Sequence, residues 1–256
     1  MTAVERLSYG PHPDQWIDVG RPSGTARGTA ALVHGGFWRA AYDASLMLPL
    51  ASDLLRRGWV AANVEYRRPG RETEAGWPAV LADVAGAFDA LGMLASAQPL
   101  VAIGHSAGGQ LALWAAARAG LPDGAPGAVP RVVPGHVVAQ AGVLDLEAAA
   151  DERLGRDAAR LLLGGGPDRV ADRYALASPI RRLPLGADQL IVHGVDDPHV
   201  PCEMSRRYAE AARRAGDSVT LVELDGVGHF EHLDPGHRAW GSVVSYLDAI
   251  AAEPVS

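Results

Sequence analysis

A short glycine-rich stretch in the middle of the chain constrains the fold more than any other segment. Residues 100–103 form an apolar run that predicts a buried strand, and residues 111–117 predict an apolar helix. Between them lies Gly104-x-Ser106-x-Gly108. A strand that turns at once into a helix strains the backbone of the residue at the turn, and the glycines let both backbones pass closely. We therefore expect Ser106 to stand exposed at the carboxyl end of the strand, above the positive end of the helix.

Strands and helices are predicted in alternation along the rest of the chain, which indicates the fold class. The alternation predicts an α/β fold, with a mostly parallel, doubly wound sheet that has helices on both faces. Residues 16–19 are expected to add a short edge strand. Apolar runs predict buried strands at 29–33, 59–66, 100–103, 137–140, 189–192 and 218–224, and helices are predicted at 42–57, 78–91, 111–117, 202–215 and 238–252.

One segment interrupts this alternation and bears on the domain organisation. The 256 residues suffice for one sizeable α/β domain, so we expect a single domain over residues 1–256. Within it, residues 145–185 predict only short helices, near 158–163 and 169–174. Two interpretations remain open: the segment is a cap or lid over the mouth of a site, or it merely packs on the edge of the sheet.

The composition excludes several functional classes. Apolar residues make up 48% of the chain, which favours a globular core. With 23 Lys and Arg against 30 Asp and Glu, the net charge is −7, so we expect no nucleic-acid partner. Cys202 is the only cysteine, so no internal disulfide can form. No apolar run is long enough for a membrane span, and residues 1–10 lack a signal-peptide pattern. We expect a cytoplasmic protein, and the sequence leaves its oligomeric state open.

The loops after the predicted strands carry the residues that acyl transfer requires. In a doubly wound sheet, the loops at the carboxyl ends of the strands share one crevice. Ser106 is the candidate nucleophile, and His229 is the candidate general base and later acid, since it directly follows a predicted strand near the end of the chain. Asp197 would orient the imidazole and stabilise its charged form, and the adjacent Asp196 is the alternative.

A second glycine pair, after the strand at 29–33, predicts an oxyanion hole. Adjacent glycines allow a turn whose backbone N–H groups face outward, so Gly36, Phe37 and Ala107 are the candidate donors. We expect His34 to fix this loop by hydrogen bonding. Trp38 and Tyr66 are candidate substrate-binding residues in an aromatic wall. This chemistry needs no cofactor, and His229 and its neighbouring histidines lack the partners of a metal site.

Together these motifs resemble the α/β-hydrolase superfamily and, within it, the esterase and kynurenine formamidase (arylformamidase) group. The resemblance extends from about residue 29 onward. It implies that Asp197 is the acid and that Gly36 and Phe37 form the oxyanion loop. It also implies hydrolysis of a small carboxylic ester or an N-formyl aryl amide through an acyl-enzyme. The segments that carry it are HGGFW at 34–38, GHSAGG at 104–109, HGxxDxxVP at 193–201 and GHF at 228–230.

Two departures and two alternative functions accompany this resemblance. Hormone-sensitive-lipase-like esterases usually have a third glycine where this chain has Phe37, and an acidic residue where it has His105. A prolyl-oligopeptidase-like peptidase is one alternative, and the lack of an amino-terminal propeller speaks against it. A non-catalytic ligand-binding protein on the hydrolase fold is the other, but no member of the serine–histidine–aspartate triad is missing.

Overall fold

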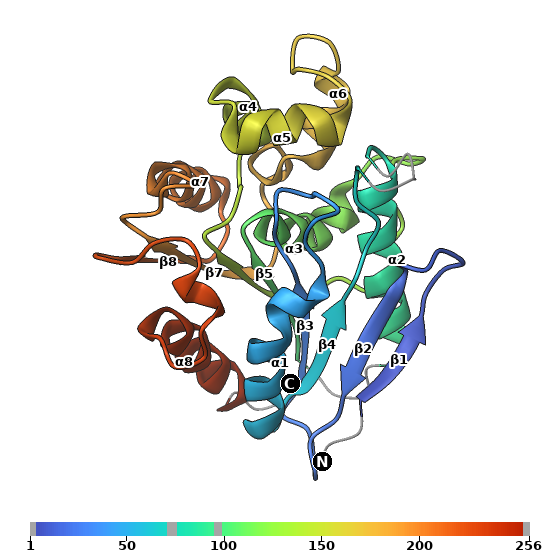
Figure 1. Cartoon of the computed structure of the whole chain (residues 1–256), viewed down its shortest axis with the longest axis vertical. Coiled ribbons are helices and arrows are strands. Elements are labelled where there is room, and N and C mark those ends of the chain that lie inside the picture. The colour runs from blue at the N-terminus through green and yellow to red at the C-terminus, as the bar shows by residue number, and fades with distance from the viewer. Residues whose placement is uncertain (1–3, 71–75, 95–98, 253–256) are drawn as a thin grey trace.

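The computed structural model describes residues 4–70, 76–94 and 99–252, and within them eight strands form one twisted sheet (Figure 1). The order across the sheet is β1-β2-β4-β3-β5-β6-β7-β8. All pairings among strands β3 to β8 are parallel, whereas β1 pairs antiparallel with β2 and β2 pairs antiparallel with β4. The predicted mostly parallel sheet is therefore confirmed. The strands are β1 (Val4–Ser8), β2 (Trp16–Gly20), β3 (Thr29–Val33), β4 (Val60–Val64), β5 (Leu100–His105), β6 (His136–Gln140), β7 (Asp188–Gly194) and β8 (Val219–Leu224).

Residues 16–19 form a strand, as predicted, but the prediction that it lies at the edge of the sheet is wrong. Strand β2 lies one strand in from the edge, because β1 pairs with it from Val4 opposite Gly20. Most residues of β1 are exposed, so this strand has no apolar run by which it could be recognised. Arg6 stabilises the pairing, since its guanidinium lies 2.7 Å from Asp18 and 3.5 Å from the centre of the Trp16 ring.

Helices cover both faces of the sheet, as predicted. Alternate residues of the central strands point to opposite faces: Leu32 and Ile103 to one buried cluster, and Val33 and Ala102 to the other. The first face is covered by α1 and α8, and the second by α2, α3 and α7. Together with short 3-10 helices, written η, the helices that the structure describes outside residues 145–185 are η1 (Ala44–Met47), α1 (Leu48–Arg56), α2 (Ala79–Leu94), α3 (Ala107–Ala117), η2 (Arg118–Gly120), α7 (Cys202–Ala215), η4 (Glu231–Leu233) and α8 (Arg238–Ala252). No helix in the described ranges is long and apolar enough to cross a membrane.

The segment 145–185, here called the cap segment, lies beyond the carboxyl ends of the strands (Figure 1). It contains α4 (Leu146–Asp151), α5 (Leu154–Leu163), α6 (Ala171–Ala177) and η3 (Pro179–Arg182), so two of its helices were expected and α4 was not. Its α6 end is attached to α3, because Gln110 and Trp114 donate to the carbonyl oxygens of Ala177 and Leu176. Its α5 part lies over the loop after β3, whose Arg39 donates to the carbonyl oxygen of Gly155.

Candidate active site

The turn between β5 and α3 has the strained geometry that the sequence predicts. Ser106 has φ 57° and ψ −119°, a backbone conformation that residues other than glycine rarely adopt. A Cβ atom on Gly104 would overlap the carbonyl oxygen of Gly108, and one on Gly108 would overlap the carbonyl oxygen of Val33. The two glycines are therefore required because the backbones of β5, α3 and β3 approach one another closely.

Ser106 differs from the prediction in its exposure. The residue is only 1% exposed, whereas the strand–turn–helix pattern alone predicted an exposed side chain. It lines a cavity of about 60 Å³ instead. The pattern describes only the turn, and the residues that close over Ser106 come from distant loops. They are Gly36, Phe37, Tyr42, Leu46, His199, His229 and Phe230, together with the adjacent His105.

Asp197 and His229 are joined by a short hydrogen bond. The Nδ1–H of His229 donates to Oδ2 of Asp197 over 2.6 Å, while Oδ1 accepts the backbone N–H groups of His199 and Val200. Burial alone would raise the pKa of Asp197, but hydrogen bonds from His193 and His229 hold that pKa well below its usual range. The carboxylate therefore stays ionised beside the imidazole.

The structure separates the two candidate acids. Asp196 is exposed, and its backbone N–H donates to the carbonyl oxygen of Val227. It is Asp197 whose carboxylate meets the imidazole of His229.

His229 is oriented as a general base requires. Since Nδ1 carries the proton that bonds to Asp197, Nε2 has the free lone pair that can accept a proton. His229 and Ser106 line the same cavity, although no hydrogen bond joins their side chains in the part of the chain described. Hydrogen bonds of this kind are often long before substrate binds. The structure therefore places Ser106 and His229 on one small cavity, with Asp197 hydrogen-bonded to His229.

His105 connects the serine turn to the histidine loop, a role that the sequence did not indicate. Its Nε2–H donates to the backbone carbonyl oxygen of His229 over 2.8 Å, and the two rings lie 4.7 Å apart. Burial lowers the pKa of His105 well below that of a free imidazole, and the neighbouring His229 lowers it further. The neutral ring therefore acts as a hydrogen-bond donor that holds the backbone of His229 in place.

The loop after β3 lies directly against the candidate nucleophile. A Cβ atom on Gly35 would be 2.9 Å from Cβ of Ser106. Gly36, Phe37 and Trp38 all have positive φ, at 104°, 50° and 54°, so the loop turns through three left-handed residues in succession. The N–H groups of Gly36 and Phe37 donate to no other described residue. Gly36 and Phe37 line the same cavity as Ser106, so their N–H groups remain the candidate oxyanion donors.

A buried network holds this loop in its conformation. The Nδ1–H of His34 donates to the carbonyl oxygen of Gly35 over 2.8 Å, and Arg68 donates to Nε2 of His34 over 3.1 Å. Burial, together with the nearby charge of Arg68, lowers the pKa of His34 to about 3, so the ring is neutral. This confirms that His34 fixes its own loop. Glu65, which accepts from Arg68 and from the N–H of Ala44, was not recognised in the sequence because it lies within the apolar run at 59–66, directly after β4.

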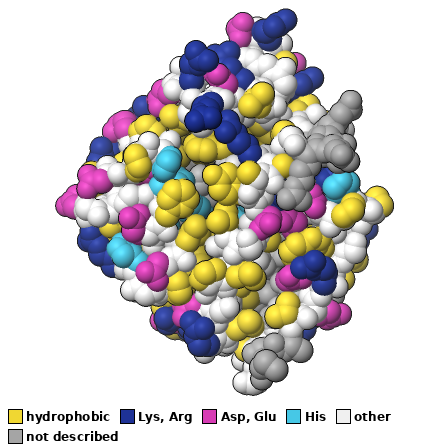
Figure 2. Space-filling view, in the orientation of Figure 1, with side chains coloured by type: hydrophobic (Ala, Val, Ile, Leu, Met, Phe, Trp, Pro, Cys, Tyr) yellow, Lys and Arg dark blue, Asp and Glu magenta, His cyan; other side chains and the backbone are white. Residues whose placement is uncertain are grey.

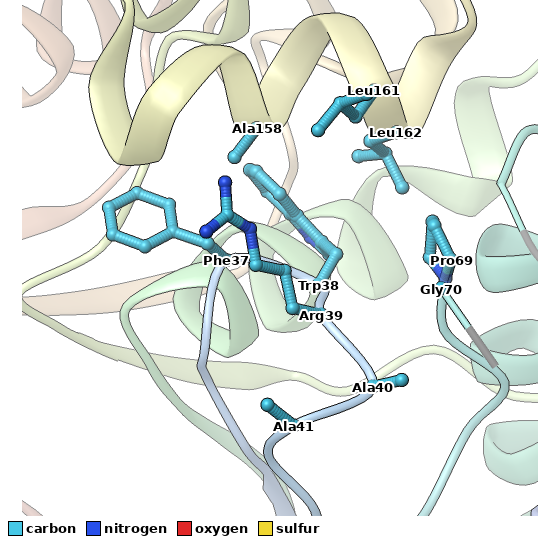
Figure 3. Close-up of a pocket in the computed structure, with 10 residues that line it drawn as sticks. All are labelled: Phe37, Trp38, Arg39, Ala40, Ala41, Pro69, Gly70, Ala158, Leu161 and Leu162. Carbon is cyan, nitrogen blue, oxygen red and sulfur yellow. The ribbon is translucent and has the colours of Figure 1, made fainter.

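A second, larger cavity of about 380 Å³ lies between this loop and the cap segment (Figure 3). Phe37, Trp38 and Arg39 line it from the loop, and Ala158, Leu161 and Leu162 line it from α5. The other lining residues are Ala40, Ala41, Pro69 and Gly70.

The two predicted substrate-binding aromatic residues occupy different places. Trp38 lines the larger cavity and is fixed by a 3.0 Å hydrogen bond from its indole N–H to Gln110. Tyr66 is outside the lining of both cavities, which corrects its predicted place in an aromatic wall. Its ring stacks on His34 at 4.4 Å and its hydroxyl donates to the carbonyl oxygen of His34. Tyr66 therefore packs against His34 and helps to hold the loop that begins there.

The surface around the cavities is apolar and rich in histidine (Figure 2). Hydrophobic and histidine side chains gather near the middle of this face, below basic side chains on the cap segment. Tyr42, Phe230 and Leu161 are exposed apolar residues that line one or the other cavity. Within residues 4–70, 76–94 and 99–252, no group of three His, Cys, Asp or Glu side chains is arranged to hold a metal ion.

We expect the buried His232 to make the fold sensitive to acid. Burial lowers its pKa to about 3, against about 6.5 for a free imidazole, so only the unfolded chain takes up this proton between those values. This difference does not lower the free energy of unfolding above pH 6.5. As the pH falls from 6.5 toward 3, it lowers the free energy of unfolding by at most about 1.4 kcal/mol per pH unit. Urea unfolding from pH 7 to pH 5 should show a shallower loss of stability for His232→Phe. Parallel curves for the two proteins would contradict this expectation.

Comparisons with known proteins find similar sequences. A family model described as BD-FAE matches residues 17–211. The esterase LipC of Mycobacterium tuberculosis is 29% identical over 247 residues, which cover 90% of this chain and 60% of that protein. The chain spans about 60% of the length of the curated relatives it matches.

Solved structures show the same fold. A truncated carbohydrate esterase from gut microbiota has a TM-score of 0.81 at 21% identity, covering 99% of this chain and 97% of that one. The butyrate-bound esterase Est2 of Thermogutta terrifontis has a TM-score of 0.76 at 22% identity, covering 96% and 94% of the two chains. The chain described above therefore has the α/β-hydrolase fold.

Proposed function

The chain belongs to the BD-FAE family, and from this premise we propose that it is a serine hydrolase of small carboxylic esters. The observation that carries the proposal is the convergence of three features on one cavity. Ser106 stands at a strained turn, and His229 is held by the ionised Asp197. Gly36 and Phe37, whose N–H groups have no described acceptor, line the same cavity as the serine. Each feature has a defined part in acyl transfer.

The reaction proceeds through an acyl-enzyme on Ser106. Nε2 of His229 accepts the hydroxyl proton as Oγ attacks the ester carbonyl carbon. The resulting oxyanion accepts hydrogen bonds from the N–H groups of Gly36, Phe37 and Ala107. As the C–O bond breaks, His229 gives its proton to the departing alcohol. Water then attacks the acyl carbonyl carbon while its proton passes to His229. As the bond between Oγ and the acyl carbon breaks, His229 returns this proton to Oγ of Ser106 and the free acid leaves.

Asp197 has a supporting role in both halves of the reaction. Its carboxylate keeps the proton of neutral His229 on Nδ1, so that Nε2 faces the reacting groups. When the imidazole becomes charged, the same carboxylate stabilises it.

The relatives favour an ester as substrate. LipC is named an esterase, one structural neighbour is a carbohydrate esterase, and Est2 is an esterase seen with butyrate. An N-formyl aryl amide is the second candidate, because residues 34–38 resemble the formamidase group and place Phe37 and Trp38 beside the site. We propose that the cap segment, as part of a single hydrolase domain, forms a wall of the substrate site.

A paired assay on the purified protein tests this proposal. We expect turnover of p-nitrophenyl acetate and butyrate, labelling by a fluorophosphonate probe, and much slower turnover of N-formylkynurenine. Faster turnover of N-formylkynurenine would favour the formamide candidate. Failure to hydrolyse any of these compounds, together with no labelling, would contradict a serine hydrolase.

A further inference from the structure

We propose that Phe37 is a specificity-determining residue that divides the substrate site and limits this enzyme to esters of short acyl chains. The inference rests on the proposed ester hydrolysis. It concerns the side chain of Phe37, whereas the mechanism uses only its backbone N–H. Phe37 lines both the cavity at Ser106 and the larger cavity under α5.

The acyl group must begin in the smaller cavity, because it is bonded to Oγ of Ser106. That cavity has about 60 Å³ of space. At 10–15 Å³ for each water-sized group, it holds roughly four to six such groups. The carbonyl oxygen and carbon occupy two of them, which leaves room for about two to four further carbons, or an acyl group of about three to five carbons in all.

The side chain of Phe37 closes the route from this cavity to the larger one. The larger cavity, of about 380 Å³, would hold a much longer chain. Figure 3 shows Phe37 at the end of its lining next to α5. The ring rests against Gly155, where an added Cβ atom would lie 2.6 Å from it. The cap segment therefore blocks movement of the ring in that direction.

The larger cavity is suited to an alkyl chain once Phe37 is removed. Ala158, Leu161 and Leu162 line it from α5, opposite Trp38 and Pro69. Among the lining residues that the structure describes, Arg39 is the one that carries a charge. Its guanidinium is turned toward the carbonyl oxygens of Gly155 and Arg156. Without the ring of Phe37, the two cavities join, and the chain of a longer acyl group gains an apolar surface.

The test compares kcat/KM for p-nitrophenyl acetate, butyrate and octanoate in the wild-type protein and in Phe37→Ala. We expect the wild type to prefer acetate and butyrate. In Phe37→Ala the ratio of octanoate to acetate should rise at least about tenfold, because added methylenes then enter an apolar pocket. Phe37→Leu should shift the ratio less in the same direction, and it provides the test if Phe37→Ala does not fold.

Leu161→Trp is the matched control, since Leu161 lines only the larger cavity and is 61% exposed. Alone, it should leave the octanoate-to-acetate ratio at the wild-type value. Combined with Phe37→Ala, it should fill the opened space and remove the gain on octanoate. An active wild type whose octanoate-to-acetate ratio is unchanged by both Phe37 variants would overturn this inference and leave the ester-hydrolase proposal intact. A wild type inert to all esters and to the fluorophosphonate would instead contradict the proposed function.

Discussion

Ser106→Ala is expected to lower kcat for p-nitrophenyl butyrate by a factor on the order of 10⁶, as removal of a catalytic serine does in comparable hydrolases. The variant loses the Oγ that we propose attacks the carbonyl, and it keeps the backbone bonds that fix the turn, such as that from its N–H to the carbonyl oxygen of Gln140. Stopped assays at high enzyme concentration give kcat, and urea unfolding reports the fold. We expect the unfolding midpoint to change little.

Ser245→Ala is the control for this prediction. Ser245→Ala, on the exposed side of α8, should retain full activity and fluorophosphonate labelling. Ser106→Ala should lose both. If Ser106→Ala kept more than a tenth of the wild-type rate, the nucleophile would have to be another residue.

Asp197→Asn is expected to lower kcat by about 10⁴, because an amide in this position leaves the imidazole in the wrong tautomer. The side-chain N–H₂ of asparagine would donate to Nδ1 of His229, which would move the ring proton to Nε2 and remove the base. The same assay measures the loss. The circular dichroism spectrum should be unchanged, because an asparagine oxygen can still accept from the backbone N–H of Val200.

Asp196→Asn is the matched control for this variant. It makes the same chemical change one residue earlier, on an exposed side chain. We expect its kcat to stay within about twofold of the wild-type value, in keeping with the small effect of most surface substitutions. Equal losses in the two variants would show that charge in this loop matters, and not the hydrogen bond of Asp197 to His229.

Local sequence patterns predicted most of the sheet and the turn at Ser106. The β3, β5 and β7 strands are apolar on both faces, and their runs were recognisable for that reason. The spacing of Gly104 and Gly108 also predicted a steric requirement that the structure confirms. Helices α7 and α8 begin and end where their patterns predict, and α7 ends at Gly216 in the left-handed conformation.

Features that depend on distant contacts could not be predicted in this way. Ser106 is buried because other loops close over it, and no local pattern contains that information. The apolar character of Tyr66 suggested a substrate wall, yet its hydroxyl and ring serve the loop at His34. His105 acts on His229 across the site, although 124 positions separate them in the chain.

The position of the cap segment has a consequence for how enzymes of this fold diversify. Strands β6 and β7 pair directly with each other, from His136 opposite Asp188, so the sheet is complete without the residues between them. The α5 part lines the larger cavity, and it contributes none of the residues around Ser106. We therefore expect substitutions of Ala158, Leu161 and Leu162 to reshape the larger cavity and to leave the lining of the cavity at Ser106 unchanged, which makes α5 the first place to vary in laboratory evolution of new selectivity.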